Sequence, residues 1–334
     1  MVKIKKLLLN KKVKILVNYF LGPVLFVILS WSLYRQIFAR PNVGIQWQQI
    51  QNSWMNSKLL LVVFLMAVNW GIEAVKWRLL VRHLQPFSYF RAFKSVLSGC
   101  SVTMLTPNRI GEYGGRILYV EEGNRISAIS LTIVGSISQL LVTMMMGCMG
   151  LLLLKYFSQT DHAITTFLPA FWQNVITSLS VVLTVLLLLF YIRLGWLVRI
   201  MEKIPALYKV VKHISVLDEF NNMQLIQILS LSFLRYLVFV LQYVLLLQVM
   251  DVHIAGWLCF LLLTIFYLVM AVAPTFAFIE LPVRISASWA IFQLYTSNQT
   301  GVSAAALGIW IINLVIPAVI GSLLILSIKI VKEK

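Results

Sequence analysis

SAISLTIVGSISQLLVTMMMGCMGLLLLKY, residues 127–156, is the stretch that decides the class of fold. It carries no charged residue before Lys155. About 20 apolar residues are enough for a helix to cross the ~30 Å hydrocarbon core of a bilayer. The Ser, Thr and Gly residues of this stretch suit close packing between membrane helices. Similar apolar runs recur, so the sequence predicts six full spans, at about residues 15–34, 59–80, 127–156, 172–192, 228–249 and 304–328.

The composition of the whole chain agrees with this class. Hydrophobic residues make up 60% of the 334 residues and charged residues only 12%, with a mean hydropathy of +0.89. A soluble domain is about a quarter charged. The ~10-residue polar and apolar alternation of a membrane β-barrel is absent. The sequence therefore predicts an all-α polytopic membrane protein, with residues 1–334 as one transmembrane domain.

The positive charge is confined to a few segments of the chain. The net charge is +17, and 19 of the 28 basic residues fall in segments 1–14, 76–94, 193–219 and 329–334. Basic clusters between spans are typical of cytoplasmic loops. They predict that both termini are cytoplasmic, and they fit contact with anionic lipid headgroups. No cluster belongs to a soluble module, so nucleic-acid binding is not expected.

The potential metal ligands and nucleophiles are few and scattered. The three cysteines lie in apolar sequence without CxxC spacing, and the four histidines are far apart. This spacing predicts neither a disulfide framework nor a metal site. No catalytic constellation and no cofactor motif is visible, so we do not expect an enzyme.

Two apolar pieces, residues 95–107 and 285–296, are too short to span. The first corresponds to only about 20 Å of helix. Each adjoins a polar motif that contains a proline, so we interpret each as one arm of a broken or re-entrant element. Irregular backbone at membrane depth is tolerated where protein covers it or where it lines a wet cavity. The alternative of a full crossing by residues 254–273 stays open.

The two polar motifs are related. PNRIGEYGGR, residues 107–116, and PTFAFIELPVR, residues 274–284, each carry a proline followed by a Glu-x3-Arg pair. The glutamates Glu112 and Glu280 are 168 residues apart, and half the chain is 167 residues. Each half crosses the membrane an odd number of times. The sequence thus predicts an inverted repeat of residues 1–165 and 166–334.

Charged residues inside membrane segments are functional candidates, because burying them is unfavourable unless they are paired or hydrated. Arginine suits a phosphate, and glutamate accepts an amine or a proton. The predicted substrate-binding residues are Pro107, Gly111, Glu112, Arg116, Pro274, Glu280 and Arg284. The alternative is that each pair only neutralises itself within a broken helix. Secondary candidates are Glu73, which Lys76 could neutralise, together with Arg109 and Arg235.

The chain resembles the lysylphosphatidylglycerol synthetase transmembrane, or flippase-like, family of bacterial inner-membrane proteins. The resemblance rests on NWGIEAVKWRLL (69–80), LTPNRIGEYGGR (105–116) and APTFAFIELPVR (273–284), and it covers nearly the whole chain. Pro107, Gly111, Glu112 and Arg116 match the family's first motif. The second motif departs from it, since residues 276–278 read Phe-Ala-Phe where Pro-Gly-Gly often occurs. A soluble synthetase domain is not expected in a chain that stops at residue 334.

The resemblance implies a bacterial inner-membrane protein that handles lipids, as some members of the family move an aminoacylated phospholipid between leaflets. The function we expect is flippase-like movement of a phospholipid or a lipid-linked headgroup. The alternatives are proton-coupled transport of a small solute and an embedded enzyme acting on a lipid. The expected partners are membrane lipids with anionic or zwitterionic headgroups. A second copy of the chain or an envelope enzyme is a further class of partner.

Overall fold

The computed structural model describes residues 56–104, 106, 110–160, 169–196, 214–272 and 280–326, together with Val27, Trp31 and Gln48. Within these residues every regular element is helical, and none is a strand. The predicted all-α membrane fold is therefore confirmed. The first predicted span, residues 15–34, lies outside the described residues apart from Val27 and Trp31.

Within the described residues, five stretches of helix are long and apolar enough to cross a membrane, and they coincide with five of the predicted spans. They are α4 (Ser57–Val81), α7 (Arg125–Thr160), α8 (Ala170–Ile192), α11 (Asn222–Val249) and the run of α14 (Gln299–Trp310), η5 (Ile311–Val315) and α15 (Ile316–Leu326). Local sequence explains several of their ends. Asn56, Asn221 and Asn298 each cap the helix that follows, and Asn221 forms a capping box with Gln224.

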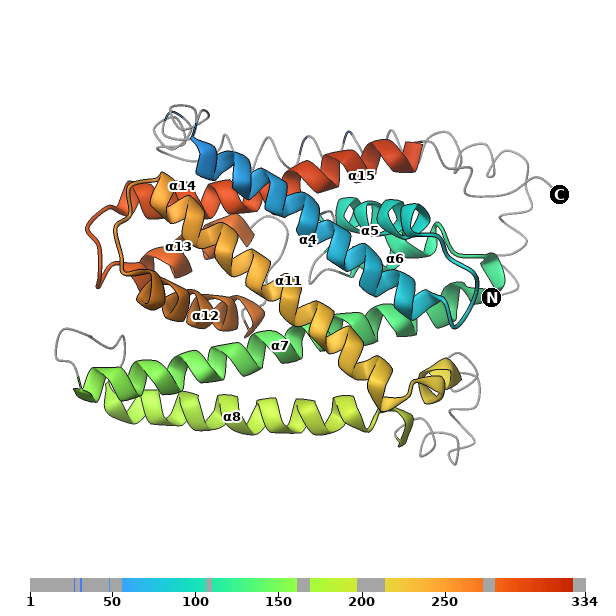
Figure 1. Ribbon diagram of the computed structural model, residues 1–334, viewed down its shortest axis with the longest axis horizontal. Coiled ribbons are helices and arrows are strands. Elements are labelled where there is room, and N and C mark those ends of the chain that lie inside the picture. Colours follow the sequence, from blue (N-terminus) through green and yellow to red (C-terminus); the bar gives the residue numbers. More distant parts are fainter. Residues whose placement is uncertain are drawn as a thin grey trace.

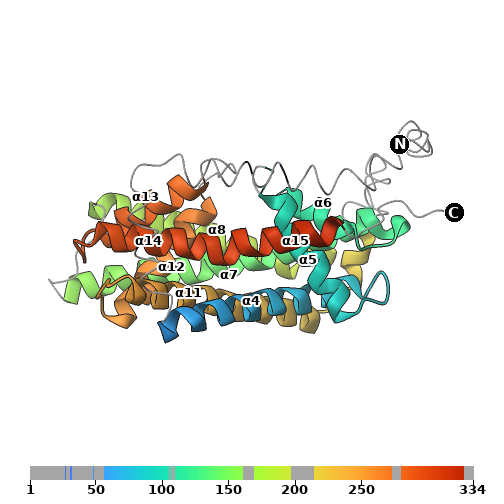
Figure 2. The same cartoon turned by 90° about the horizontal axis from the view of Figure 1, so that it is seen from above.

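The last span contains a π-helical turn, η5, between α14 and α15. Pro317 is the second residue after this turn. Proline has no backbone N–H and its ring crowds the carbonyl four residues earlier, so a regular α-helix cannot pass this point unchanged. Figure 2 shows that α14 and α15 nevertheless run on as one rod along the molecule.

The two short apolar pieces fold as parts of helix pairs. The first pair is α5 (Tyr89–Thr103) and α6 (Gly111–Ile117), and the second is α12 (Gly256–Val272) and α13 (Glu280–Phe292). Gly115 lies against Ser98 and Gly99, whereas Gly111 lies against Val102. This register is antiparallel, so α5 and α6 form a hairpin that begins and ends at the same end of the molecule.

The long helices and the two helix pairs pack in a matched arrangement. Helices α4 and α11 cross in the middle, with α5 and α6 near the end where α4 finishes and α12 and α13 toward the other end (Figure 1). Helix α5 packs against α15, and α12 packs against α7. In the predicted repeat these two packings are equivalent, although the repeat itself stays a prediction.

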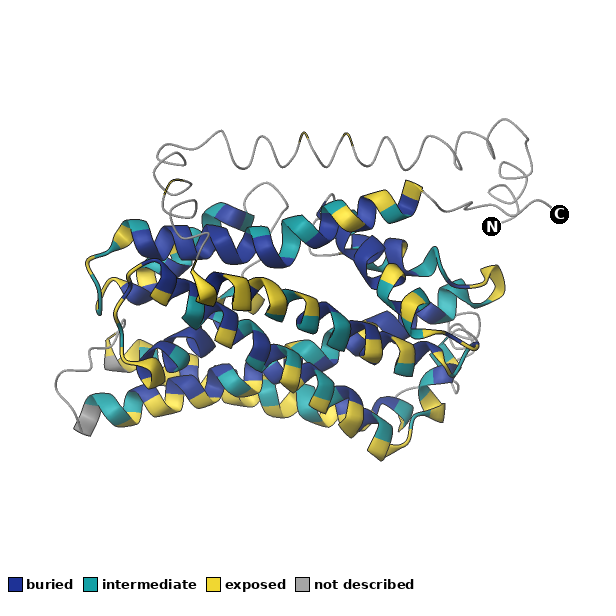
Figure 3. Ribbon diagram, turned by 45° about the horizontal axis from the view of Figure 1, so that its top comes forward, coloured by how far each residue is buried: buried dark blue, intermediate teal, exposed yellow. Residues whose placement is uncertain are grey.

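Small residues allow the closest helix contacts. The backbone of Gly321 in α15 touches the carbonyl of Leu97 in α5, and Gly150 in α7 touches Thr264 in α12. Outward faces of the long helices are exposed (Figure 3), and on α8 the exposed residues include Leu179, Leu186 and many other apolar side chains. Apolar residues on the outside are expected where the solvent is lipid.

Candidate functional site

Helix α4 carries charged and polar side chains on a face that is buried inside the bundle. Asn69, Glu73 and Lys76 are spaced four and three residues apart, so they lie on one side of the helix. Glu73 is 2% exposed and Lys76 is 1% exposed. Trp70 and Trp77 are buried beside them. Because isolated charges are not tolerated in such surroundings, Glu73 and Lys76 each need a partner of opposite charge.

Glu73 is the centre of the resulting charge cluster, because its carboxylate contacts three cations. Its Oε2 atom lies 2.8 Å from Lys76 Nζ and 2.9 Å from the guanidinium of Arg235. Its Oε1 atom accepts a hydrogen bond of 2.7 Å from Arg116. The secondary candidates Glu73 and Arg235 are thus joined to the motif residue Arg116 in one site.

Arg116 reaches Glu73 because α6 lies unusually close to α5. A side chain at Gly115 would collide with the backbone of Ser98 and Gly99, so only glycine permits this approach. The Arg116 guanidinium also binds Glu112 one turn earlier on α6. It stacks over the ring of Trp77, whose centroid is 5.1 Å away.

A relay of hydrogen bonds holds Arg116 and Trp77 together. The Trp77 indole N–H donates to the Ser95 hydroxyl over 2.9 Å. That hydroxyl in turn donates to the backbone carbonyl of Arg116, also over 2.9 Å. The orientation of both residues is therefore set by α5, the long arm of the hairpin.

Helix α11 brings the second half of the chain into the same cluster. Arg235 donates from Nε to Asn69 over 2.7 Å, and its guanidinium lies over the rings of Trp70 and Phe239. The Lys76 ammonium lies 3.3 Å from the Ser232 hydroxyl. Ser232 and Lys76 are 156 residues apart in the sequence. The site is thus built by the crossing of α4 and α11.

The cluster holds three cations and two carboxylates, which leaves one net positive charge when all five groups are ionised. Its members differ in access. The side chains of Glu73 and Arg116 are 3% and 2% exposed, whereas that of Glu112 is 23% exposed. An excess positive charge in a low-dielectric interior attracts an anion. Because Glu112 is the most exposed of these three side chains, it is the one most accessible to a ligand.

The second motif forms a separate pair. Arg284 and Glu280 of α13 lie 3.3 Å apart, and Arg284 faces the ring of Phe266 on α12. Among the described residues, no hydrogen bond or ion pair joins this pair to the Glu73 cluster. Figures 1 and 2 show α6 and α13 in opposite halves of the molecule. Pro107, Arg109 and Pro274 lie outside the described residues.

The sequence did not single out every member of the cluster. Lys76 was expected only as a neutralising partner of Glu73, and Asn69 and Ser232 were not candidates. An Asn and a Lys flanking a Glu at helical spacing are visible in the sequence. The partnership with Ser232 is not, because it depends on which helices cross. In the part of the chain that the structure describes, no group of His, Cys, Asp or Glu could hold a metal ion.

This combination of apolar spans, broken helices and a buried charge cluster defines a polytopic α-helical membrane protein with a polar site inside its bundle. In a comparison with family models, residues 19–321 match the lysylphosphatidylglycerol synthase TM region. The chain therefore belongs to this family of membrane proteins. No characterised protein and no solved structure matches it.

Proposed function

We propose that this protein moves a phospholipid between the two leaflets of a bacterial inner membrane, as a flippase does, and that it does so without chemical change to the lipid. The observation that supports this function is the Glu73 cluster. It is a buried set of charges with an excess positive charge and one partly exposed carboxylate, Glu112. It lies in a chain that belongs to a lipid-related family.

The donors of the cluster suit the phosphate of a headgroup. In and beside the cluster, three buried N–H groups have no acceptor among the described residues: Arg116 Nε, Asn69 Nδ2 and Trp70 Nε1. Buried donors without acceptors are unfavourable, so a ligand that accepts from them is stabilised. Phosphate oxygens accept several hydrogen bonds at once and match the planar guanidinium.

The carboxylate of Glu112 suits the other end of a zwitterionic headgroup. In the structure it binds Arg116, its neighbour one turn along α6. When a headgroup enters, its phosphate takes the place of Glu112 on Arg116, and its amine takes the place of Arg116 on Glu112. This exchange leaves both Arg116 and Glu112 paired with an opposite charge, which keeps the electrostatic barrier to movement low.

The test is leaflet exchange in vesicles that contain the purified full chain. A phospholipid with a labelled headgroup is followed by its accessibility to a membrane-impermeant reagent, for wild type and two variants. Glu112→Gln removes the accessible carboxylate. Lys94→Gln removes an exposed charge of α5 outside the cluster and serves as the matched control.

We expect wild type and Lys94→Gln to accelerate exchange equally, and Glu112→Gln to slow it by about tenfold or more, equivalent to roughly 1.4 kcal/mol. Size-exclusion profiles establish that the variants are folded. Equal exchange rates for Glu112→Gln and wild type would refute the assignment of the site. Vesicles in which wild-type protein gives no acceleration for zwitterionic or anionic lipid would refute the proposed function itself.

A further inference from the structure

A second basic feature lies at the C-terminal end of α4, on a face that the buried charge cluster does not use. The residues of this face recur at positions i, i+3, i+4 and i+7, which places them in one stripe along the helix. They are Val75, Arg78, Leu79 and Arg82. Val75, Arg78 and Arg82 are exposed, whereas Glu73, Lys76 and Trp77 on the other face are buried.

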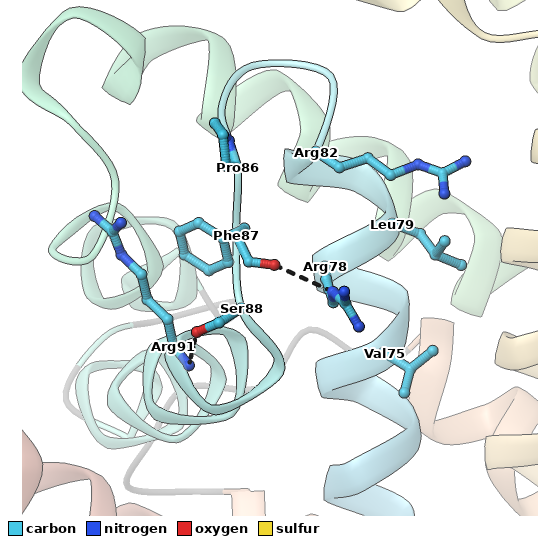
Figure 4. Close-up of a pocket in the computed structure, with 8 residues that line it drawn as sticks. All are labelled: Val75, Arg78, Leu79, Arg82, Pro86, Phe87, Ser88 and Arg91. Atoms are coloured by element: carbon cyan, nitrogen blue, oxygen red, sulfur yellow. Dashed lines mark hydrogen bonds between the residues drawn. The ribbon is translucent and has the colours of Figure 1, made fainter.

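This stripe forms one wall of a groove, and the segment that leads into α5 forms the other. Pro86, Phe87, Ser88 and Arg91 line the second wall, and the space between the walls has a volume of about 780 Å³. Figure 4 shows Arg78 between the two walls, with Arg82 and Arg91 on either side. The volume lies in the range of small-molecule binding sites. We call this space the basic groove.

Internal contacts fix the walls of the basic groove. Arg78 donates from Nε to the carbonyl of Phe87 over 3.1 Å, which joins the two walls. Arg91 donates from Nε to the carbonyl of Tyr119 over 2.8 Å, and its guanidinium lies over the ring of Phe87. Both arginines are anchored through Nε, and in the described parts of the chain no hydrogen bond occupies their terminal nitrogens.

The charge of the groove has one sign. Three arginines line it and no acidic residue does. Over the ranges that the structure describes, no carboxylate lies within ion-pair distance of Arg78, Arg82 or Arg91. Arginines with free terminal nitrogens are the preferred partners of phosphate oxygens. Because no carboxylate lines the groove, it has no group that would bind the amine of a zwitterionic headgroup.

The position of the groove indicates that a phosphate bound there would belong to a membrane lipid. Helix α4 is a candidate membrane span that ends at Val81, so Arg78 and Arg82 lie where a span reaches the headgroups. Val75 and Leu79 extend the same stripe toward the apolar part of the helix. Phe90, 76% exposed, adjoins the second wall. A ligand with a phosphate and acyl chains can contact the arginines with its phosphate and the apolar residues with its chains.

We propose that the basic groove binds the headgroup of an anionic phospholipid, with the phosphate on Arg78 and the acyl chains along Val75 and Leu79. This lipid stays bound at the surface of the protein and is not the lipid that moves between leaflets. The site is separate from the Glu73 cluster, and the inference does not depend on lipid movement between leaflets. The two sites differ in chemistry, because only the cluster contains a carboxylate for an amine.

The test is native mass spectrometry of the purified full chain with added lipid. Phosphatidic acid is the anionic probe, since its headgroup is a phosphate without an amine, and phosphatidylcholine is the zwitterionic comparison. Arg82→Gln is the main variant, because the Arg82 side chain forms no ion pair among the described residues. Arg78→Gln/Arg82→Gln is the stronger one. Arg193→Gln, at an exposed arginine directly after α8, is the matched control.

We expect wild type and Arg193→Gln to retain phosphatidic acid in preference to phosphatidylcholine. Arg82→Gln should weaken that retention about fivefold, the equivalent of the roughly 1 kcal/mol that one basic side chain contributes at an anionic membrane surface. The double variant should abolish the preference. Full retention in Arg82→Gln and the double variant, or an equal loss in Arg193→Gln, would overturn the proposal. Displacement of the lipid by millimolar inorganic phosphate would assign the groove to a free anion instead.

Discussion

Glu73→Gln tests whether one carboxylate neutralises three cations inside the bundle. Glu73 is 3% exposed in its side chain and lies 2.7–2.9 Å from Lys76, Arg116 and Arg235. Glutamine keeps the shape of the side chain but removes its charge. The net charge of the cluster then rises from one positive charge to two. Removing one member of a buried ion pair destabilises a protein by about 3–5 kcal/mol, because the remaining charge is left uncompensated.

Glu112→Gln provides the comparison, because Glu112 has a single cationic partner among the described residues and a side chain that is 23% exposed. Water then compensates part of the lost interaction, so we expect about 1–2 kcal/mol for this variant. The difference between the two variants should be at least about 1 kcal/mol. A partial rescue should follow from Glu73→Gln/Lys76→Met, which returns the cluster to one net positive charge. Groups in contact couple by about 0.5–3 kcal/mol.

The assay is equilibrium unfolding in mixed micelles with an increasing fraction of anionic detergent, followed by tryptophan fluorescence. Trp70 and Trp77 are buried beside the cluster, so their emission reports on its loss. The reasoning would be refuted by a Glu73→Gln variant as stable as Glu112→Gln. It would also be refuted if the double variant proved no more stable than Glu73→Gln alone.

Two further predictions concern the α5–α6 hairpin and the loop after α4. Gly115→Ala should destabilise by about 1–3 kcal/mol through overpacking against Ser98 and Gly99, whereas the neighbouring Gly114→Ala, with no atom within 4 Å of its new methyl group, should be neutral or slightly stabilising. Thermal melting of the two variants side by side measures this contrast, and equal melting temperatures would contradict the close approach. Burial, and secondarily Arg82, lowers the pKa of His83 below its ordinary value, although Glu219 at 3.8 Å opposes this. The folded state thus prefers the neutral imidazole, so this stabilisation is complete above about pH 6.5 and is lost as the pH falls through the folded-state pKa. His83→Gln should flatten that pH dependence in unfolding measurements, and an unchanged slope would argue against it.

The sequence by itself determined the class of protein and the local charge pairs. Uncharged runs such as residues 126–154 indicate a membrane helix, because their length matches the bilayer and they are mostly apolar and carry no charge. The short pieces around residues 95–107 and 285–296 indicated broken elements by their length and by the proline-containing motifs beside them, and α5 and α13 are indeed short, with 15 and 13 residues. The Glu112–Arg116 and Glu280–Arg284 pairs follow from i,i+4 spacing on one helix, and both are present.

Only the tertiary structure decided where these pairs belong. Arg116 is bound by Glu73, which is 43 residues away, and Lys76 meets Ser232 across 156 residues. Such partners depend on the crossing of α4 with α11 and on the glycine contacts that bring α6 to α5. In a soluble protein, hydrophobic periodicity shows which face of a helix is buried. In a membrane protein both the core and the lipid-facing surface are apolar, so the periodicity does not show which helix faces meet. The buried polar groups decide this instead, because each charge at depth must find its partner.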